Sequence, residues 1–258
     1  MTMINHVLTI AKNTFRETMR DRIVLAACGL VFVMIAFSLF IGTVSIDQDI
    51  RMIIDFSLTA IYLLQIFVAI FIGSMLIYKD VERKTFFLIL PKPIKTESII
   101  IGKCLGLTAT TFVVTAFSTI ALFIILFFKG NNLYLIPITI SVFLSLLEST
   151  LIILISMLFS SMSTPILSAV YTIGFYLIGH SSEIYRTFMF QMVPGIKLYA
   201  LQIAYYLLPN LEKFNIRNDV IYEKIPHPFT ILITILYALC FAIILFLITS
   251  MNFKKKEF

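Results

Sequence analysis

Charged residues are scarce in this sequence of 258 residues. They make up 13% of the chain, whereas 60% of its residues are hydrophobic and its mean hydropathy is +1.00. A typical soluble domain carries about 25% charged and about 45–50% apolar residues. Because too few polar side chains are present to cover a surface in water, the composition excludes a soluble enzyme and a nucleic-acid-binding domain. It indicates an integral membrane protein that folds as one bundle.

The sequence motifs of common catalytic and metal sites are also absent. The phosphate-binding pattern G-x-x-x-x-G-K-[ST] does not occur, so the chain cannot bind ATP in that manner itself. Neither H-E-x-x-H of zinc proteases nor G-x-S-x-G of serine hydrolases occurs. The three cysteines lie far apart, without the spacing of a disulfide or a metal site. We therefore expect no catalytic residue, no metal and no cofactor in this chain.

Six apolar runs fit membrane-spanning helices. A helix crosses about 30 Å of hydrocarbon in about 20 residues, and continuous apolar runs without strand alternation favour helices over a barrel. The fifth run is short and opens at Thr164-Pro165, a typical helix start. The sequence predicts an all-α membrane protein, a six-transmembrane-helix bundle with spans over residues 23–44, 56–78, 104–128, 135–159, 164–180 and 229–251.

The distribution of Lys and Arg indicates the orientation. The cytoplasmic side of a membrane protein carries the excess of these residues. With the N-terminus inside, the inner segments 1–22, 79–103, 160–164 and 252–258 hold 13 of the 20. The outer segments hold the other 7, over residues 45–55, 129–134 and 181–228. We expect a multi-pass protein of the plasma (inner) membrane with both termini in the cytoplasm.

The N-terminal residues 1–22 have the 3.6-residue periodicity of an amphipathic helix. One face carries mostly apolar residues: Ile4, Val7, Leu8, Ala11, Phe15, Thr18 and Met19. The opposite face carries cations, Arg16 and Arg20 among them, which would lie near anionic headgroups. We expect an interfacial helix, and the sequence leaves open whether it is only an anchor or also packs against a cytosolic partner.

Two further segments are neither spans nor plain loops. In the loop 79–103 a charged turn precedes the apolar stretch 85–90, which is too short to span and should bury its apolar side in another protein or in the bundle. This loop ends at Gly102-xxx-Gly106, a spacing that permits close helix approach. In the outer segment 181–228, the apolar stretch 196–208 is about 20 Å of helix, so we expect a re-entrant or interfacial segment.

Glu148 is the only acidic residue deep within a predicted span. A charged carboxylate that faced lipid would cost at least about 2.5–3.5 kcal/mol, so this side chain should face protein or water. Ser145 and Ser149 lie near its helical face, and Gln65 lies in the second span. One interpretation is a substrate path or a dimer seam. The other is a protonated Glu148 that bonds to neighbouring Ser and Thr, with Gln65 joining two helices.

The loop between the second and third spans resembles that of ABC-2 type ABC transporter permeases, in particular the subset associated with multicopper-enzyme maturation and gliding. The matching residues are Glu82-Arg83-Lys84-Thr85, an apolar turn that ends at Leu90, then Pro93-Ile94 and Gly102-Lys103. The order of the motifs and the six spans extend the resemblance over the whole chain. Two positions depart from the pattern: Lys84 stands where many relatives have Gly, and Thr96 where many have Arg.

The resemblance implies a dimer of ABC ATPase subunits on separate chains, which bind ATP and Mg. A coupling helix would contact them through Glu82, Arg83, Lys84, Thr85, Phe86, Phe87 and Leu90, beside Phe15, Arg16 and Arg20 of the interfacial helix. ATP-driven closure would move this chain against a second copy or a similar permease, and the resemblance favours export. From the residues alone, a membrane anchor that recruits a cytosolic protein stays open, as does, with less support, an intramembrane lipid-modifying enzyme.

Overall fold

The structure is a computed structural model that describes residues 3–44, 48–82, 96–131, 133–181, 209–222 and 226–254. Within these ranges every regular element is a helix. The elements are α1 (Met3–Met19), α2 (Arg22–Val44), α3 (Asp49–Glu82), α5 (Thr96–Phe128), α6 (Leu135–Met162), α7 (Pro165–His180), the 3-10 helix η1 (Leu211–Phe214), α10 (Arg217–Ile221) and α11 (Pro228–Lys254). The prediction of an all-α protein is confirmed for this part of the chain.

Among the described helices, α2, α3, α5, α6 and α11 are long and apolar enough to cross a membrane. The start of α7 at Thr164-Pro165 is confirmed, but with 16 residues, or about 24 Å, this helix is shorter. Two helices begin earlier than predicted, α3 at Asp49 instead of residue 56 and α5 at Thr96 instead of 104. The prediction followed the apolar run, whereas helical hydrogen bonding continues through the polar turns beside it.

Helices α3 and α6 form the centre of the bundle. In their most apolar windows 78% and 67% of the residues are buried, against 22% for α2 and 17% for α11. α2 packs on α3, and α11 packs on α6. The outer helices expose Leu, Ile and Phe side chains on most of their surface, as helices surrounded by lipid can. The contact between α3 and α6 is therefore the core of the bundle.

The central helices run parallel and are joined by small residues. Ser156 of α6 donates to the carbonyl oxygen of Ala69 at 3.1 Å, and Ser160 donates to that of Ser74 at 2.6 Å. A Cβ atom at Gly73 would overlap the Ser156 hydroxyl, so glycine is needed for this approach. Small residues that let two backbones approach, with hydroxyls that bond across, are typical of helix pairs in membranes.

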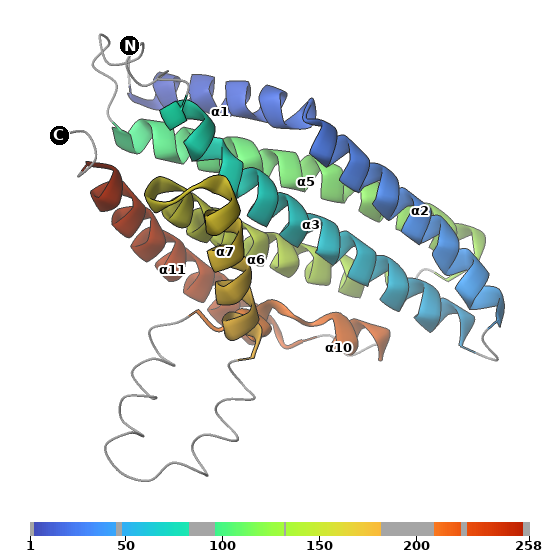
Figure 1. Cartoon of the computed structure of the whole chain (residues 1–258). Helices are drawn as coiled ribbons and strands as arrows, with labels where there is room; N and C mark the ends of the chain where they lie inside the picture. Colours follow the sequence, from blue (N-terminus) through green and yellow to red (C-terminus); the bar gives the residue numbers. More distant parts are fainter. Residues whose placement is uncertain are drawn as a thin grey trace.

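The two ends of the bundle differ in the connections they carry. Figure 1 shows the start of α1, the end of α11, the end of α3 and the start of α5 together at one end. Because α6 runs parallel to α3, the turn between α6 and α7 belongs to this end as well. The α2–α3 and α5–α6 connections lie at the opposite end. The segments that we assigned to the cytoplasm thus share one end of the molecule, where the structure describes them.

α1 packs along the first half of α5 in a parallel register, as Figure 1 shows. Gly102 lies against Ile10, Gly106 lies against Ala11 and Thr14, and the hydroxyls of Thr18 and Thr110 bond to each other. The close helix approach expected at Gly102-xxx-Gly106 is confirmed, and its partner is α1.

The face of α1 that packs on α5 overlaps the predicted apolar face only in part. Ile4 and Leu8 are 68% and 60% exposed, whereas Thr14 and Thr18 are buried. Phe15 is half-buried, and Arg16 and Arg20 are exposed as expected. The side chains of α1 that are buried against α5 are those that fit over Gly102 and Gly106.

Gly106→Ala tests the contact between α1 and α5. A Cβ atom there would lie 2.6 Å from the carbonyl oxygen of Ala11 and 2.7 Å from Thr14 Cβ, so α1 must shift. We expect a loss of about 1–3 kcal/mol of stability and a lower midpoint of thermal unfolding in detergent. Gly29→Ala is the matched control, because a Cβ atom at Gly29 meets nothing within 4 Å. Equal midpoints for the two variants would contradict the contact.

Candidate functional site

The buried carboxylate of Glu148, in the middle of α6, is the centre of a polar cluster. Its side chain is fully buried. Oε1 accepts a hydrogen bond from the hydroxyl of Tyr62 on α3 at 2.7 Å and lies 2.8 Å from Nε2 of His180, the last residue of α7. The expectation that Glu148 faces protein is confirmed. The interpretation in which Glu148 bonds to neighbouring Ser and Thr is wrong, because its described hydrogen bonds go to Tyr62 and His180 on other helices.

The imidazole of His180 lies between two carboxylates. Its Nδ1 is 2.6 Å from Oε2 of Glu212, a residue of η1, while Nε2 faces Glu148. The hydroxyl of Tyr62 lies within 2.7 Å of the same Nε2 and 3.0 Å from the hydroxyl of Tyr176. The His180 imidazole therefore brings together side chains from α3, α6, α7 and η1.

Arg217 closes the cluster from α10. Its Nε donates to Oδ1 of Asn215 at 3.0 Å, and Nδ2 of Asn215 donates to Oε1 of Glu212 at 2.9 Å. The guanidinium carbon lies 3.9 Å from the centre of the Tyr62 ring, an arrangement that attracts the cation to the ring face. The positive charge of Arg217 is thus held near both carboxylates without a direct ion pair to either among the described contacts.

The short length of α7 makes room for this arrangement. Because α7 extends only about 24 Å, it ends at the level of Glu148 and leaves the rest of α6 uncovered on that side. Residues 209–222 fill the space and bury Leu211, Phe214 and Val220. A Cβ atom at Gly179 would lie 2.8 Å from the side chain of Leu211, so this glycine permits the contact.

The segment 209–222 is also tied to α11. The backbone N–H of Asn210 donates to the hydroxyl of Tyr237 at 2.7 Å, and Nζ of Lys213 lies 4.4 Å from the centre of the same ring. The sequence assigns the segment 181–228 to the outer side of the membrane and predicts a re-entrant or interfacial stretch at 196–208. That stretch lies outside the described residues, and the part that does pack into the bundle is 209–222.

The remaining polar residues predicted for a path or seam stand apart from the cluster. Ser145 and Ser149 are buried and donate to carbonyl oxygens of their own helix, those of Val142 and Leu146. Gln65 donates from Nε2 to the hydroxyl of Thr115 on α5 at 3.2 Å. Of the four predicted residues, only Glu148 therefore belongs to a network that joins several helices.

The predicted coupling residues lie at the edge of what the structure describes. Glu82 is the last residue of α3, whereas Arg83, Lys84, Thr85, Phe86, Phe87 and Leu90 lie outside the described residues. The helices on either side of this segment are joined, because the buried Lys103 of α5 donates from Nζ to the carbonyl oxygen of Leu76 on α3 at 2.8 Å. This bond joins the two helices that the predicted coupling loop connects.

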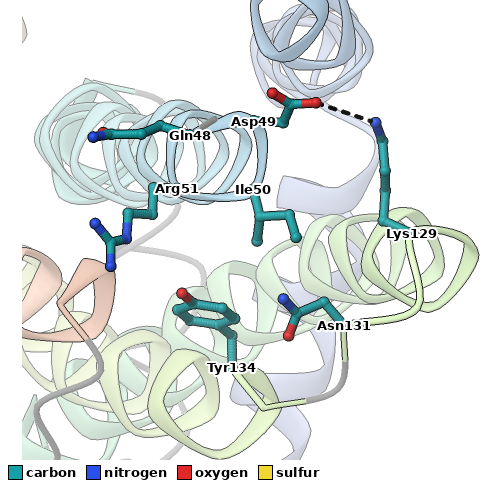
Figure 2. A pocket seen from close by; sticks show the side chains of 7 residues that line it. All are labelled: Gln48, Asp49, Ile50, Arg51, Lys129, Asn131 and Tyr134. Atoms are coloured by element: carbon teal, nitrogen blue, oxygen red, sulfur yellow. Dashed lines mark ion pairs between the residues drawn. The ribbon is translucent and has the colours of Figure 1, made fainter. Parts of the chain in front are cut away.

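A second polar region is the hollow at the opposite end of the bundle. It measures about 480 Å³ and is lined by Gln48, Asp49, Ile50, Arg51, Lys129, Asn131 and Tyr134. Figure 2 shows Lys129 reaching from the end of α5 toward Asp49 at the start of α3, with 4.0 Å between the charged atoms. Both side chains are about two-fifths exposed, so water weakens this ion pair.

The arrangement around Glu148 suits proton transfer better than metal binding. Among the described residues, no group of three or more His, Cys, Asp or Glu side chains could hold a metal ion. An imidazole between two carboxylates can accept a proton on one ring nitrogen and donate the proton on the other. The sequence analysis missed Tyr62, His180, Glu212 and Arg217; the only signal for them was that Glu148 needed polar partners.

The comparison with protein-family models gives no match, and neither does the comparison with curated proteins.

Tyr62→Phe tests the contribution of the cluster to stability. The change removes one hydroxyl that donates to Glu148 and contacts His180 and Tyr176. Since it leaves a buried carboxyl with one bond fewer, we expect a loss of about 1–3 kcal/mol, measured as a lower thermal midpoint in detergent. The control is Tyr171→Phe on α7, whose exposed hydroxyl has no hydrogen-bond partner in the described part of the chain. A similar midpoint in both variants would argue against the cluster as a structural junction.

Proposed function

We propose that this chain is the membrane-spanning permease subunit of an ATP-driven ABC transporter. ATP hydrolysis would take place on separate ATPase chains, and the resemblance to ABC-2 type permeases favours export. The chain would work with a second copy or with a similar permease. Its own residues would receive the movement of the ATPases and transmit it through the bundle.

The observation that most supports this proposal is that α3 and α5, the helices on either side of residues 83–95, are joined to each other. α3 ends just before residues 83–95 and α5 begins just after them, at the end of the bundle that also holds the start of α1 and the end of α11. Lys103 joins α5 to the carbonyl oxygen of Leu76, about 1.7 helical turns before Glu82. A partner that moved the segment 83–95 would therefore move two joined helices together.

α3 offers a continuous route from that end to the centre of the bundle. It bonds to α6 through Ser156 and Ser160, and to the polar cluster through Tyr62. From Glu82 to Tyr62 the helix measures about 30 Å. In the proposed mechanism α3 would move as a rigid unit, so that a displacement at Glu82 would reach the cluster around Glu148.

α1 would take part as a support for α5. Its parallel contact over Gly102 and Gly106 covers the start of α5, and its cations Arg16 and Arg20 remain exposed. Exposed cations on such a helix can contact anionic headgroups or an acidic surface on a partner protein. α1 and the segment 83–95 would thus offer the partner ATPase two neighbouring contacts.

Charge reversal at the predicted coupling site tests the proposal. The tagged chain is purified from its native membranes in mild detergent, and Mg-dependent ATP hydrolysis of the eluate is measured. We expect the wild-type chain to bring an ATPase with it, and the double variant Glu82→Lys with Arg83→Glu to lose both the partner and the activity. Opposite charges would face the partner in this variant, and like charges in contact cost several kcal/mol.

The matched control reverses a charge pair at the other end of the bundle. Asp49→Lys with Lys129→Asp exchanges the ion pair of Figure 2 and should leave ATPase binding unchanged. Size-exclusion chromatography shows whether each variant is folded. Full activity in the Glu82 and Arg83 variant would contradict the proposed contact. A wild-type eluate without any ATPase would favour the alternative of a membrane anchor.

A further inference from the structure

The contact between Glu148 and His180 requires a proton between the two side chains. Oε1 and Nε2 are 2.8 Å apart, a distance at which two lone pairs repel each other unless a proton lies between them. On the other side of the ring, Nδ1 and Oε2 of Glu212 are 2.6 Å apart and share a proton in the same way. Each contact therefore holds a proton that either partner can carry.

The surroundings of Glu148 favour its neutral form. Its second oxygen, Oε2, is buried and has no hydrogen-bond partner among the described residues. A buried ionised carboxylate with one bare oxygen is costly, whereas a neutral carboxyl leaves only a carbonyl oxygen unpaired. With the proton on Oε1, the Tyr62 hydroxyl still donates to that oxygen and Nε2 of His180 accepts from it.

The charge balance of the cluster agrees with this assignment. The titratable or charged groups around His180 are Tyr62 on α3, Glu148 on α6, Tyr176 on α7, Glu212 on η1 and Arg217 on α10. Lys213 faces Tyr237 of α11 instead. With one proton shared between Glu148 and His180, these two side chains together carry no net charge, and the negative charge of Glu212 cancels the positive charge of Arg217. A buried cluster without net charge is the least costly one in a membrane.

The exposed fraction of the side chain decreases from Glu212 through His180 to Glu148. The side chain of Glu212 is 36% exposed, that of His180 is 17% exposed and that of Glu148 is fully buried. We propose that Glu212 and His180 form a proton path from the protein surface to a proton-binding site at Glu148. The ligand of this site is the proton itself, and the inference does not depend on the partner ATPase.

Each transfer along this path moves one proton and no electrons. Glu212 gives a proton to Nδ1 of His180, and the N–H bond at Nε2 breaks as its proton passes to Oε1 of Glu148. The electron pair of that bond stays on Nε2, so the imidazole ends neutral with its proton on the other nitrogen. Histidine is suited to this step because it exchanges protons near neutral pH.

Infrared spectroscopy of the purified chain in lipid bilayers tests the proton-binding site. We expect the carbonyl stretch of a protonated carboxyl in the wild type and its loss in Glu148→Gln. Glutamine is close to Glu in shape and keeps a hydrogen-bonding group near Tyr62 and His180. Absence of the band in the wild type, or its persistence in Glu148→Gln, would overturn the assignment.

Transfer into D₂O tests the path. The band of Glu148 shifts when its proton is replaced by deuterium, and the rate of this shift measures access to solvent. We expect exchange to be more than about tenfold slower in His180→Phe and in Glu212→Gln than in the wild type. The second variant alters a partly exposed side chain, so it remains informative if His180→Phe does not fold.

Asp219→Asn is the matched control. Asp219 is an exposed carboxylate on α10, in the same segment as Glu212 but without a contact to the cluster among the described interactions. Its exchange rate should equal that of the wild type. Wild-type exchange in Glu212→Gln and in every folded His180 variant would overturn the path.

Discussion

A carboxyl group buried in an apolar bundle must find its partners inside the protein, and the fold around Glu148 follows from this constraint. Hydrocarbon provides no hydrogen bonds, so Tyr62 and His180 approach from two other helices. α7 ends where its histidine reaches the carboxyl, and residues 209–222 occupy the space beyond it. Glu212 and Arg217, which carry charges of opposite sign, complete the contacts around His180 and Tyr62. One buried acid thus determines how five elements meet.

α3 connects this cluster with the end of the bundle that we assign to the cytoplasm. Tyr62 binds the cluster, serines of α6 bind the α3 backbone, and Lys103 joins α3 to α5 close to Glu82. In the proposed transporter, this helix would carry movement from an ATPase to the opposite half of the bundle. The proton site lies on that route, so a transport cycle could change the environment of the proton as α3 shifts. The outer helices α2 and α11 offer mainly apolar surface to lipid.

The sequence predicts the elements of the fold better than their contacts. The apolar runs locate α2, α6, α7 and α11 to within a few residues, since length and hydropathy are local properties. The burial of Glu148 in protein also follows from its cost in lipid. Its partners do not, because Tyr62 is 86 positions away and His180 is 32 positions away, and only packing brings them together. The sequence does not show which residues of α1 pack on α5, because that contact depends on two glycines of another helix.

The orientation of the bundle is the claim on which the functional account depends, and labelling of single cysteines tests it most directly. The three native cysteines are replaced by alanine, and one cysteine is introduced at Thr164, between α6 and α7, or at the exposed Leu133, before α6. Intact cells are treated with a maleimide that does not cross membranes. The account predicts that Leu133→Cys is labelled and that Thr164→Cys reacts only after the membrane is permeabilised. Labelling of Thr164→Cys in intact cells would place residues 83–95 outside, beyond the reach of any cytoplasmic ATPase, and would contradict the account.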